Sequence, residues 1–240
     1  MADPDYGETW VYESVVGALP GIEVPPRTAI AAQFLVFEVP LLALAAVYDL
    51  WTAAVAGTVA VTVATAGSVE MLRVGRLVRR AGGPEPYRRL LFGSSVEVVL
   101  AVLAYVALVT HLFVFDPREA ARPLLAALLG PEPPVLVVYL TLLILWDVCY
   151  RIGTGWWASV VALWRSARYR FDPATAATLR RADLETMAFG LLQLVLVPFV
   201  AGRPILVTAV VGHVVAVTLV TGASVALLRL RTGTETATTT

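Results

Sequence analysis

Residues 134–170 read PVLVVYLTLLILWDVCYRIGTGWWASVVALWRSARYR, and this apolar stretch decides the fold. It is longer than the roughly 20 residues that a helix needs to cross a bilayer. Gly153 and Gly155 leave only about a dozen apolar residues after them, too few for a second crossing. Asp147 and Arg151 lie near its middle, one helical turn apart. The sequence therefore predicts one continuous helix whose inner end projects beyond the bilayer into water.

The composition of the whole chain agrees with a membrane environment. Of its 240 residues, 58% are hydrophobic and 15% are charged, and the mean hydropathy is +0.78. Soluble domains carry about 25% charged residues. The 18 basic residues, all arginine, are balanced by 18 acidic residues. No nucleic-acid partner is expected, because such a partner requires a basic excess.

Hydropathy divides the chain into six apolar segments joined by short polar connections. The fold class is therefore all-α, a polytopic membrane bundle of six transmembrane helices. We divide the chain into a lead-in over 1–26 with a candidate interfacial helix, a transmembrane domain over 27–231 and a disordered tail over 232–240. A short polar helix is expected over 173–185. The expected segments are 28–50, 51–72, 90–115, 134–170, 186–200 and 205–230.

The positions of the arginines predict the orientation in the membrane. Fourteen of them lie in the even-numbered loops or beside the termini, whereas three, Arg118, Arg122 and Arg203, lie in the odd-numbered loops. Loops on the cytoplasmic side are enriched in arginine and lysine. We therefore predict a multi-pass protein of the cell membrane with both termini in the cytoplasm.

A local pattern recurs at the inner end of the three even segments. The runs SVEMLR, SVVALWR and SVALLR begin at Ser68, Ser159 and Ser224. Such a pattern suits three parallel hairpin repeats, with chance resemblance in a Val-, Leu- and Ala-rich chain as the alternative. Under the repeat hypothesis, the odd segments contribute equivalent polar residues to a common interior, namely Glu38, Glu97 and Gln193.

Five residues form the candidate intramembrane polar cluster, because ionisable groups within a span are costly and turn inward. Asp147 and Arg151 have the i, i+4 spacing of an ion pair, and Glu97 at similar depth offers Arg151 a second acceptor. Glu38 has no local partner, so it is a candidate proton or cation site, with a hydrogen-bonded packing role as the alternative. Gln193 is expected to form an interhelical hydrogen bond.

No motif in the chain points to catalysis, a cofactor or a metal. His111 and His213 have no metal-ligand spacing to another residue, and phosphate-binding, dinucleotide-binding and nucleophile motifs are absent. We therefore expect no catalytic, cofactor-binding or metal-binding residue, and no enzymatic activity. Glu70, three residues before Arg73, is expected to reach the surface and form an ion pair there.

Three runs resemble a known family. They are ETWVYESVVGALPG at 8–21, RRLLFGSSVEVVL at 88–100 and LWDVCYRIGTGWWASVVALWRS at 145–166. They are similar to uncharacterised multi-pass membrane proteins of halophilic archaea that have no assigned function. The resemblance extends over nearly the whole chain and implies a membrane setting in a salt-rich cell. It assigns no role to any residue of this sequence.

Two main functions remain open at this level. The first is a non-enzymatic membrane scaffold or partner-binding protein, which the absence of motifs favours. The alternative is a small ion or solute transporter or channel that uses Glu38, Glu97 and Asp147; an enzyme acting on lipid is a third class. Carboxylates that line one water-accessible cavity would favour transport, and carboxylates sealed by side chains would favour a scaffold. The lipid bilayer is an expected partner, with a protein partner or a homo-oligomer left open.

Overall fold

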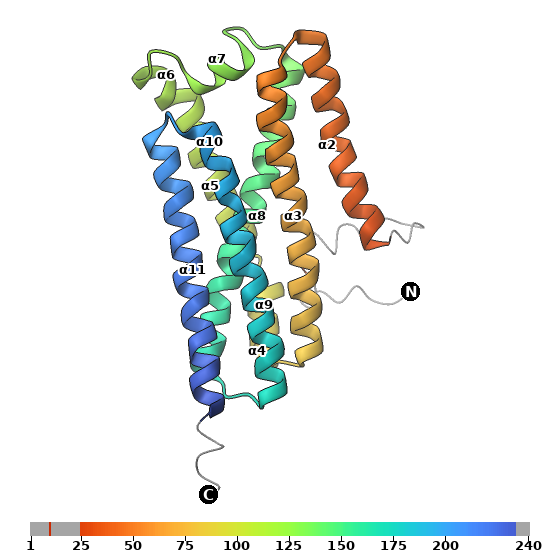
Figure 1. Cartoon of the computed structure of the whole chain (residues 1–240), viewed down its shortest axis with the longest axis vertical. Coiled ribbons are helices and arrows are strands. Elements are labelled where there is room, and N and C mark those ends of the chain that lie inside the picture. The colour runs from red at the N-terminus through yellow and green to blue at the C-terminus, as the bar shows by residue number, and fades with distance from the viewer. Residues whose placement is uncertain (1–9, 11–24, 234–240) are drawn as a thin grey trace, which may run out of the picture.

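The computed structural model describes residue 10 and residues 25–233, which form a bundle of long helices (Figure 1). Within this part of the chain, six helical stretches are long and apolar enough to cross a membrane. The prediction of an all-α bundle with six membrane-crossing helices is confirmed. The α-helices are α2 (Pro26–Tyr48), α3 (Trp51–Ala81), α4 (Glu85–Phe92), α5 (Val96–Thr110), α6 (Asp116–Glu119), α7 (Leu124–Leu129), α8 (Val135–Arg168), α9 (Pro173–Leu192), α10 (Val197–Val200) and α11 (Pro204–Gly233).

Two short stretches of different helical pitch extend these elements. A π-helical stretch, η1 (His111–Phe115), continues α5, and a 3₁₀ stretch, η2 (Gln193–Leu196), joins α9 to α10. Consecutive long helices pack as hairpins: α2 with α3, α5 with α8, and α9 with α11. This pairing is compatible with the proposed hairpin repeat, which stays a prediction.

Helix α8 lies in the middle of the bundle and packs against α3, α5 and α11 (Figure 1). It continues for 34 residues without a break, about 50 Å at 1.5 Å per residue, whereas the hydrocarbon core of a bilayer is about 30 Å thick. Gly153 is a point of close helix contact, because a Cβ there would lie 2.9 Å from the backbone nitrogen of Ala101 in α5. The prediction of one continuous helix is therefore confirmed.

Helix α3 continues well beyond the apolar segment that was expected to end near Leu72. It ends at Gly82, whose φ of 61° is the left-handed conformation of a glycine C-cap. No proline interrupts the helix before that point, so the arginines expected in a loop extend the helix instead. These helical arginines are Arg73, Arg76, Arg79 and Arg80.

Helix α9 likewise combines two expected elements, the short polar helix over 173–185 and the start of the fifth apolar segment. Asp172 caps its first turn by accepting hydrogen bonds from the backbone nitrogens of Ala174 and Thr175, both at 3.0 Å. Hydrogen bonding by the side chain and the backbone N–H of Thr175 lowers the pKa of Asp172 from its ordinary value. Asp172 and Pro173 therefore start the helix as expected, but no break separates its polar and apolar halves.

The two ends of the bundle differ in charge. Figure 1 places α7 and the turns between α2 and α3 and between α10 and α11 at its upper end, and α4 and the connection between α8 and α9 at its lower end. Arg118, Arg122 and Arg203 belong to the upper connections, whereas fourteen arginines lie toward the lower end. Helix α2 begins, and α11 ends, toward this arginine-rich lower end.

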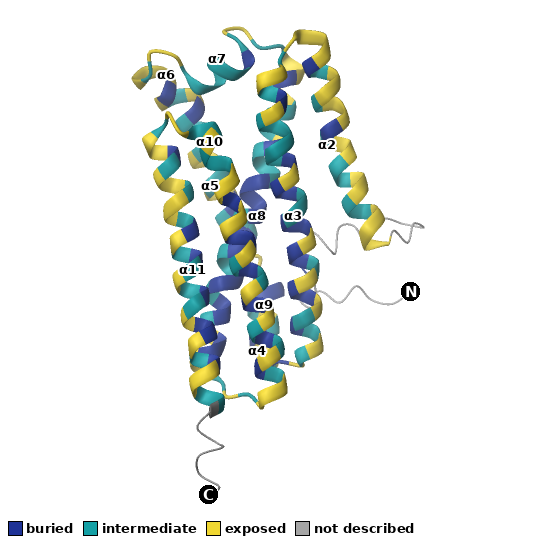
Figure 2. Ribbon diagram, viewed as in Figure 1, coloured by how far each residue is buried: buried dark blue, intermediate teal, exposed yellow. Residues whose placement is uncertain are grey.

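The outer faces of the bundle are apolar and exposed. Figure 2 shows long exposed stripes on α2 and α11, and they include Val36, Val47 and Leu219, which are 65%, 72% and 67% exposed. An apolar surface of this extent is unusual for a water-soluble monomer. It fits the hydrocarbon of a bilayer, which agrees with the six membrane-crossing helices.

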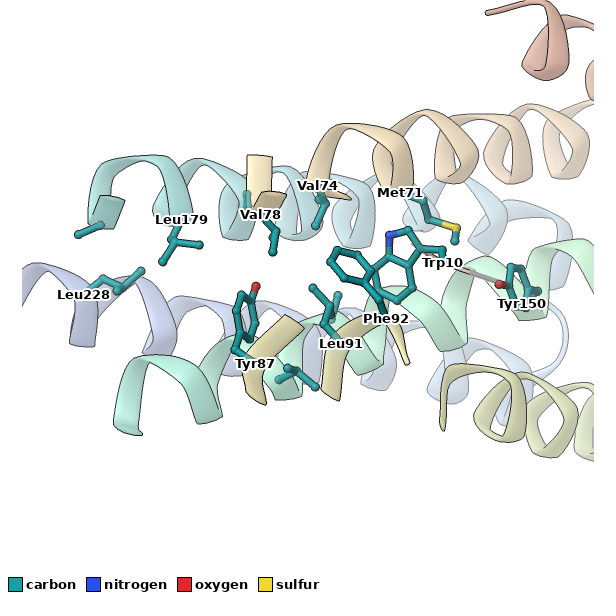
Figure 3. Close-up of a cluster of buried hydrophobic side chains, with 14 of the residues drawn as sticks. Trp10, Met71, Val74, Val78, Tyr87, Leu91, Phe92, Tyr150, Leu179 and Leu228 are labelled. Carbon is teal, nitrogen blue, oxygen red and sulfur yellow. The ribbon is translucent and has the colours of Figure 1, made fainter. Parts of the chain in front are cut away.

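A cluster of buried apolar side chains packs between the helices, with members from α3, α4, α5, α8, α9 and α11 (Figure 3). Met71 and Val78 of α3 meet Tyr87 and Phe92 of α4 there. Trp10 packs edge-on against Phe92 with the ring centroids 5.0 Å apart. The rest of the candidate interfacial helix, at 1–9 and 11–24, lies outside the described residues. The expected tail lies outside them from residue 234 onward, whereas its first two residues, Thr232 and Gly233, belong to α11.

Candidate functional site

Asp147 and Arg151 form the expected ion pair on α8. Nη2 of Arg151 lies 3.0 Å from Oδ1 of Asp147, and the Arg151 side chain is only 1% exposed. The second carboxylate oxygen, Oδ2, accepts a hydrogen bond of 2.6 Å from Nε2 of Gln33 in α2. Ser68 of α3 donates in turn to Oε1 of Gln33 at 2.8 Å. This network connects α2, α3 and α8 and gives both oxygens of Asp147 a partner.

Glu97 does not act as the second acceptor for Arg151. Its side chain is fully buried, and neither carboxylate oxygen has a hydrogen-bond partner among the residues described. Nη1 of Arg151 points instead to Sδ of Met71 at 2.9 Å. The α5 backbone around Glu97 lies against Gly153, and positions two residues apart on a helix face different directions. Arg151 therefore turns toward α3 while Gly153 faces α5.

Glu38 finds a partner on the neighbouring helix. Oγ1 of Thr58 in α3 donates to Oε1 of Glu38 at 2.6 Å, whereas Oε2 is buried and has no partner within the described part of the chain. Gln193, the remaining member of the candidate cluster, is buried at the start of η2. The structure thus buries the three polar positions of the proposed repeat, but it does not connect Glu38 with Glu97.

The prediction that Glu70 forms a surface ion pair is wrong. Glu70 is buried and accepts a hydrogen bond of 2.9 Å from Oγ1 of Thr186 in α9. Arg73 pairs instead with Glu185, at 2.5 Å between Nη2 and Oε1. Helices α3 and α9 pack side by side, so α9 covers the face of α3 that carries Glu70.

Sequence reasoning missed a second buried ion pair, between Arg165 of α8 and Asp183 of α9. Nη2 of Arg165 lies 2.7 Å from Oδ2 of Asp183, and their side chains are 0% and 3% exposed. Nη1 of Arg165 donates to the Tyr87 hydroxyl at 3.1 Å, and Oγ of Ser224 donates to Asp183 at 2.7 Å. The sequence did contain a signal, because Asp183 follows the apolar residues Ala176 and Leu179 at intervals of three and four and so shares their helical face, which is the buried face of α9.

A further ion pair lies at the upper end of the bundle. Nε of Arg203 lies 2.9 Å from Oδ1 of Asp116, and Oδ2 of Asp116 accepts a hydrogen bond of 2.5 Å from the backbone nitrogen of Leu124. Asp116 therefore joins the start of α6 to the start of α7 and to the turn before α11. These contacts give the upper connections a fixed position.

A cavity of about 240 Å³ lies in the upper half of the bundle. Residues of α2, α3, α7, α8 and α11 line it, among them Leu41, Ala60, Leu128, Ile144 and Leu206, and no Asp, Glu, Arg or His does. None of the five candidate polar residues borders it. Because the lining has no charged or imidazole group, this space offers an ion no polar path.

A second pocket, of about 250 Å³, opens at the lower end between α3 and α9. We name it the arginine pocket. The residues that line the arginine pocket are Arg73, Arg76, Leu77, Arg80, Arg181 and Glu185.

Among the residues that the structure describes, no group of three or more His, Cys, Asp or Glu side chains is placed to hold a metal ion.

Comparisons with known proteins show the family but no activity. No curated protein and no solved structure matches the chain. A family model described as a family of unknown function matches residues 5–224, which is nearly the whole chain. The resemblance to a family without an assigned function is confirmed, whereas an origin in halophilic archaea stays a prediction. The chain therefore belongs to the family of unknown function DUF7530.

Proposed function

We propose that this chain is a non-enzymatic membrane scaffold or partner-binding protein. The observation that carries the proposal is that both carboxylate oxygens of Asp147, in the central ion pair, already contact other side chains. Arg151 and Gln33 occupy the two carboxylate oxygens of Asp147, and the cavity above them is apolar. An ion or a polar solute needs polar groups along a water-accessible path. The contacts of Asp147 therefore support a structural role.

The two buried ion pairs suit a bundle whose purpose is a fixed shape. Arg165 and Asp183 hold α8 against α9, and the network of Asp147 and Gln33 holds α8 against α2. Buried ion pairs add little net stability, but removing one partner is costly. Alternative packings of the helices that leave one of these charges unpaired are therefore unfavourable. The bundle keeps a single helix arrangement, and a partner would bind to the one outer surface that this arrangement presents.

The proposal includes an orientation and a set of partners. The arginine-rich lower end faces the cytoplasm of a cell membrane, with both termini on that side, as the positive-inside rule favours. Lipid covers the exposed apolar faces of α2 and α11. A second protein or another copy of this chain is the remaining partner of the scaffold.

Single-cysteine labelling tests the orientation. In a Cys149→Ala background, an Ala126→Cys variant in α7 should react with a membrane-impermeant maleimide on intact cells, because α7 belongs to the upper end. An Ala81→Cys variant at the end of α3 should react only after the membrane is permeabilised. Reaction of both variants from the same side would contradict the six-crossing topology, and the reverse pattern would contradict the orientation.

Flux assays test the scaffold proposal against transport. Proteoliposomes that contain the purified chain should pass H⁺, Na⁺ and K⁺ no faster than protein-free liposomes, measured with ion-sensitive dyes inside the vesicles. The reason is that the apolar cavity within the described part of the bundle borders none of the buried carboxylates. A flux that depends on the protein, and that Glu38→Gln or Glu97→Gln abolishes, would overturn the scaffold proposal.

Transport remains the second candidate because of one specific observation. Both carboxylate oxygens of Glu97 are buried without a hydrogen-bond partner among the described residues. An ionisable group inside a span that lacks a partner is a functional candidate by default, here for a proton or a cation. Glu119→Gln is the matched control for the flux assay, because Glu119 lies in the short helix α6 at the upper end.

A further inference from the structure

The arginine pocket between α3 and α9 is built by residues that share a face on each helix. Arg73, Arg76 and Arg80 follow one another at intervals of three and four along α3, so they project from one side of that helix. Arg181 and Glu185 of α9 are four residues apart and project toward them. The two helices thus present four guanidinium groups and one carboxylate to a shared space of about 250 Å³.

The charges inside the pocket are not balanced. Oε1 of Glu185 lies 2.5 Å from Nη2 of Arg73 and 4.0 Å from Nε of Arg181, so one carboxylate serves two arginines. Nε of Arg76 donates to the carbonyl oxygen of Leu72 at 3.1 Å, which does not neutralise its charge. Arg76 and Arg80 form no ion pair with any described residue. The pocket therefore has an excess of positive charge at its Arg76 and Arg80 end.

The depth of the pocket matches the headgroup layer of a membrane. The apolar part of α3 ends near Leu72, and the apolar part of α9 begins near Thr186. Arg73 and Glu185 therefore lie at the edge of the hydrocarbon, and Arg80 lies about 10 Å farther along the α3 axis. The polar layer adds roughly 5–8 Å on each side of the hydrocarbon, so the backbone of Arg76, about 5 Å beyond Arg73, lies within it. The backbone of Arg80 lies just outside this layer, but side chains on a helix lean toward its N-terminus, which directs Arg80 back toward the lipid phosphates.

We propose that the arginine pocket binds a phosphate group, with Arg76 and Arg80 as its ligands. The planar guanidinium group matches phosphate with paired hydrogen bonds, and basic pockets between transmembrane helices accept anionic headgroups. Glu185 pairs with Arg73 and Arg181, and its negative charge repels an anion. The phosphate group therefore lies at the Arg76 and Arg80 end of the pocket. An anionic lipid headgroup and free phosphate share this chemistry. The proposal goes beyond the scaffold function and does not depend on it.

The test uses the full-length chain, purified and delipidated in a neutral detergent. Bound lipid is counted by native mass spectrometry during titration with phosphatidylglycerol, and with phosphatidylcholine of the same acyl chains for comparison. We expect binding of phosphatidylglycerol to be at least about tenfold weaker in the Arg76→Gln/Arg80→Gln variant, because two charged hydrogen-bond donors are removed. Both residues are exposed, so the melting temperature without lipid should match that of the unaltered chain.

The matched control removes the same charge from the same end of the molecule. Arg168 and Arg229 are exposed and lie outside the pocket, and the Arg168→Gln/Arg229→Gln variant should bind phosphatidylglycerol within about twofold of the unaltered chain. Equal weakening in the two double variants would reduce the binding to general surface attraction and overturn the proposal. Full binding by the Arg76→Gln/Arg80→Gln variant would overturn it as well, as would equal binding of the two lipids.

Addition of 10 mM sodium phosphate separates the two sources of the phosphate group. Lipid that stays bound to the unaltered chain in this buffer assigns the pocket to a headgroup. Lipid that is displaced by phosphate, but not by the same ionic strength of sodium chloride, assigns it to free phosphate. Both results support the site, whereas equal displacement by the two salts shows only charge screening and overturns it.

Discussion

Asp183→Ala should lower the free energy of unfolding by about 3–5 kcal/mol, the range for removing one partner of a buried ion pair. The substitution leaves the guanidinium group of Arg165 buried with the Tyr87 hydroxyl and serines around it but without its carboxylate. An uncompensated charge in this position is the most unfavourable state that a single substitution in the pair creates. Unfolding of the purified chain in detergent, followed by tryptophan fluorescence, measures the effect.

A neighbouring residue supplies the control for this experiment. Glu185 lies two positions further along α9 and pairs with Arg73, but the two side chains are 21% and 44% exposed. Glu185→Ala should therefore cost less than about 1 kcal/mol, as partly exposed pairs do. An Arg165→Met/Asp183→Leu variant should recover much of the loss, because no charge is left buried. If Asp183→Ala cost no more than Glu185→Ala, the buried pair would not stabilise the bundle.

Gly153→Leu should cost about 3 kcal/mol, at the upper end of the range for overpacking. A Cβ at this position would lie 2.9 Å from the backbone nitrogen and 3.2 Å from the Cα of Ala101. Those atoms belong to the main chain of α5, so relief requires separation of α5 from α8. At Gly57, by contrast, the nearest atoms belong to the flexible side chain of Leu41. Thermal unfolding in detergent measures the loss.

Gly212 of α11 is the matched control for the glycine experiment. Nothing lies within 4 Å of a Cβ built there, so Gly212→Leu should change stability by less than about 1 kcal/mol, with better helix propensity as its main effect. Equal losses at Gly153 and Gly212 would show that the contact between α5 and α8 contributes little. A loss confined to Gly153→Leu would establish this contact as a tight interface.

Features within one helix were predictable from the sequence. The ion pair of Asp147 and Arg151 depends on a separation of four residues, and the continuity of α8 depends on its length and hydropathy. Neither requires knowledge of a neighbouring helix. The ends of α3 and α9 were misjudged because hydropathy follows the thickness of the bilayer, whereas a helix continues until a residue such as Gly82 ends it.

Contacts between helices were not predictable in the same way. Arg165 and Asp183 belong to different helices, and their meeting depends on how α8 and α9 are aligned along their axes. Glu70 was assigned a partner by its closeness to Arg73 in the chain, but the packing of α9 decided its contacts. Glu97 does not contact Arg151, because the face of α8 that packs against α5 carries Gly153 and not Arg151. A single sequence shows how residues are spaced along one helix. It does not show how that helix is rotated about its axis or shifted along it relative to a neighbouring helix.

The two buried ion pairs differ in which helices each of them requires. Asp147 and Arg151 lie on the same helix, so their pairing requires only that α8 itself has formed. Arg165 has its carboxylate on α9 and a hydroxyl partner on α11, and both helices are synthesised after α8. The charge of Arg151 can therefore be paired before α9 and α11 exist, whereas Arg165 gains its carboxylate and hydroxyl partners only when those two helices are in place.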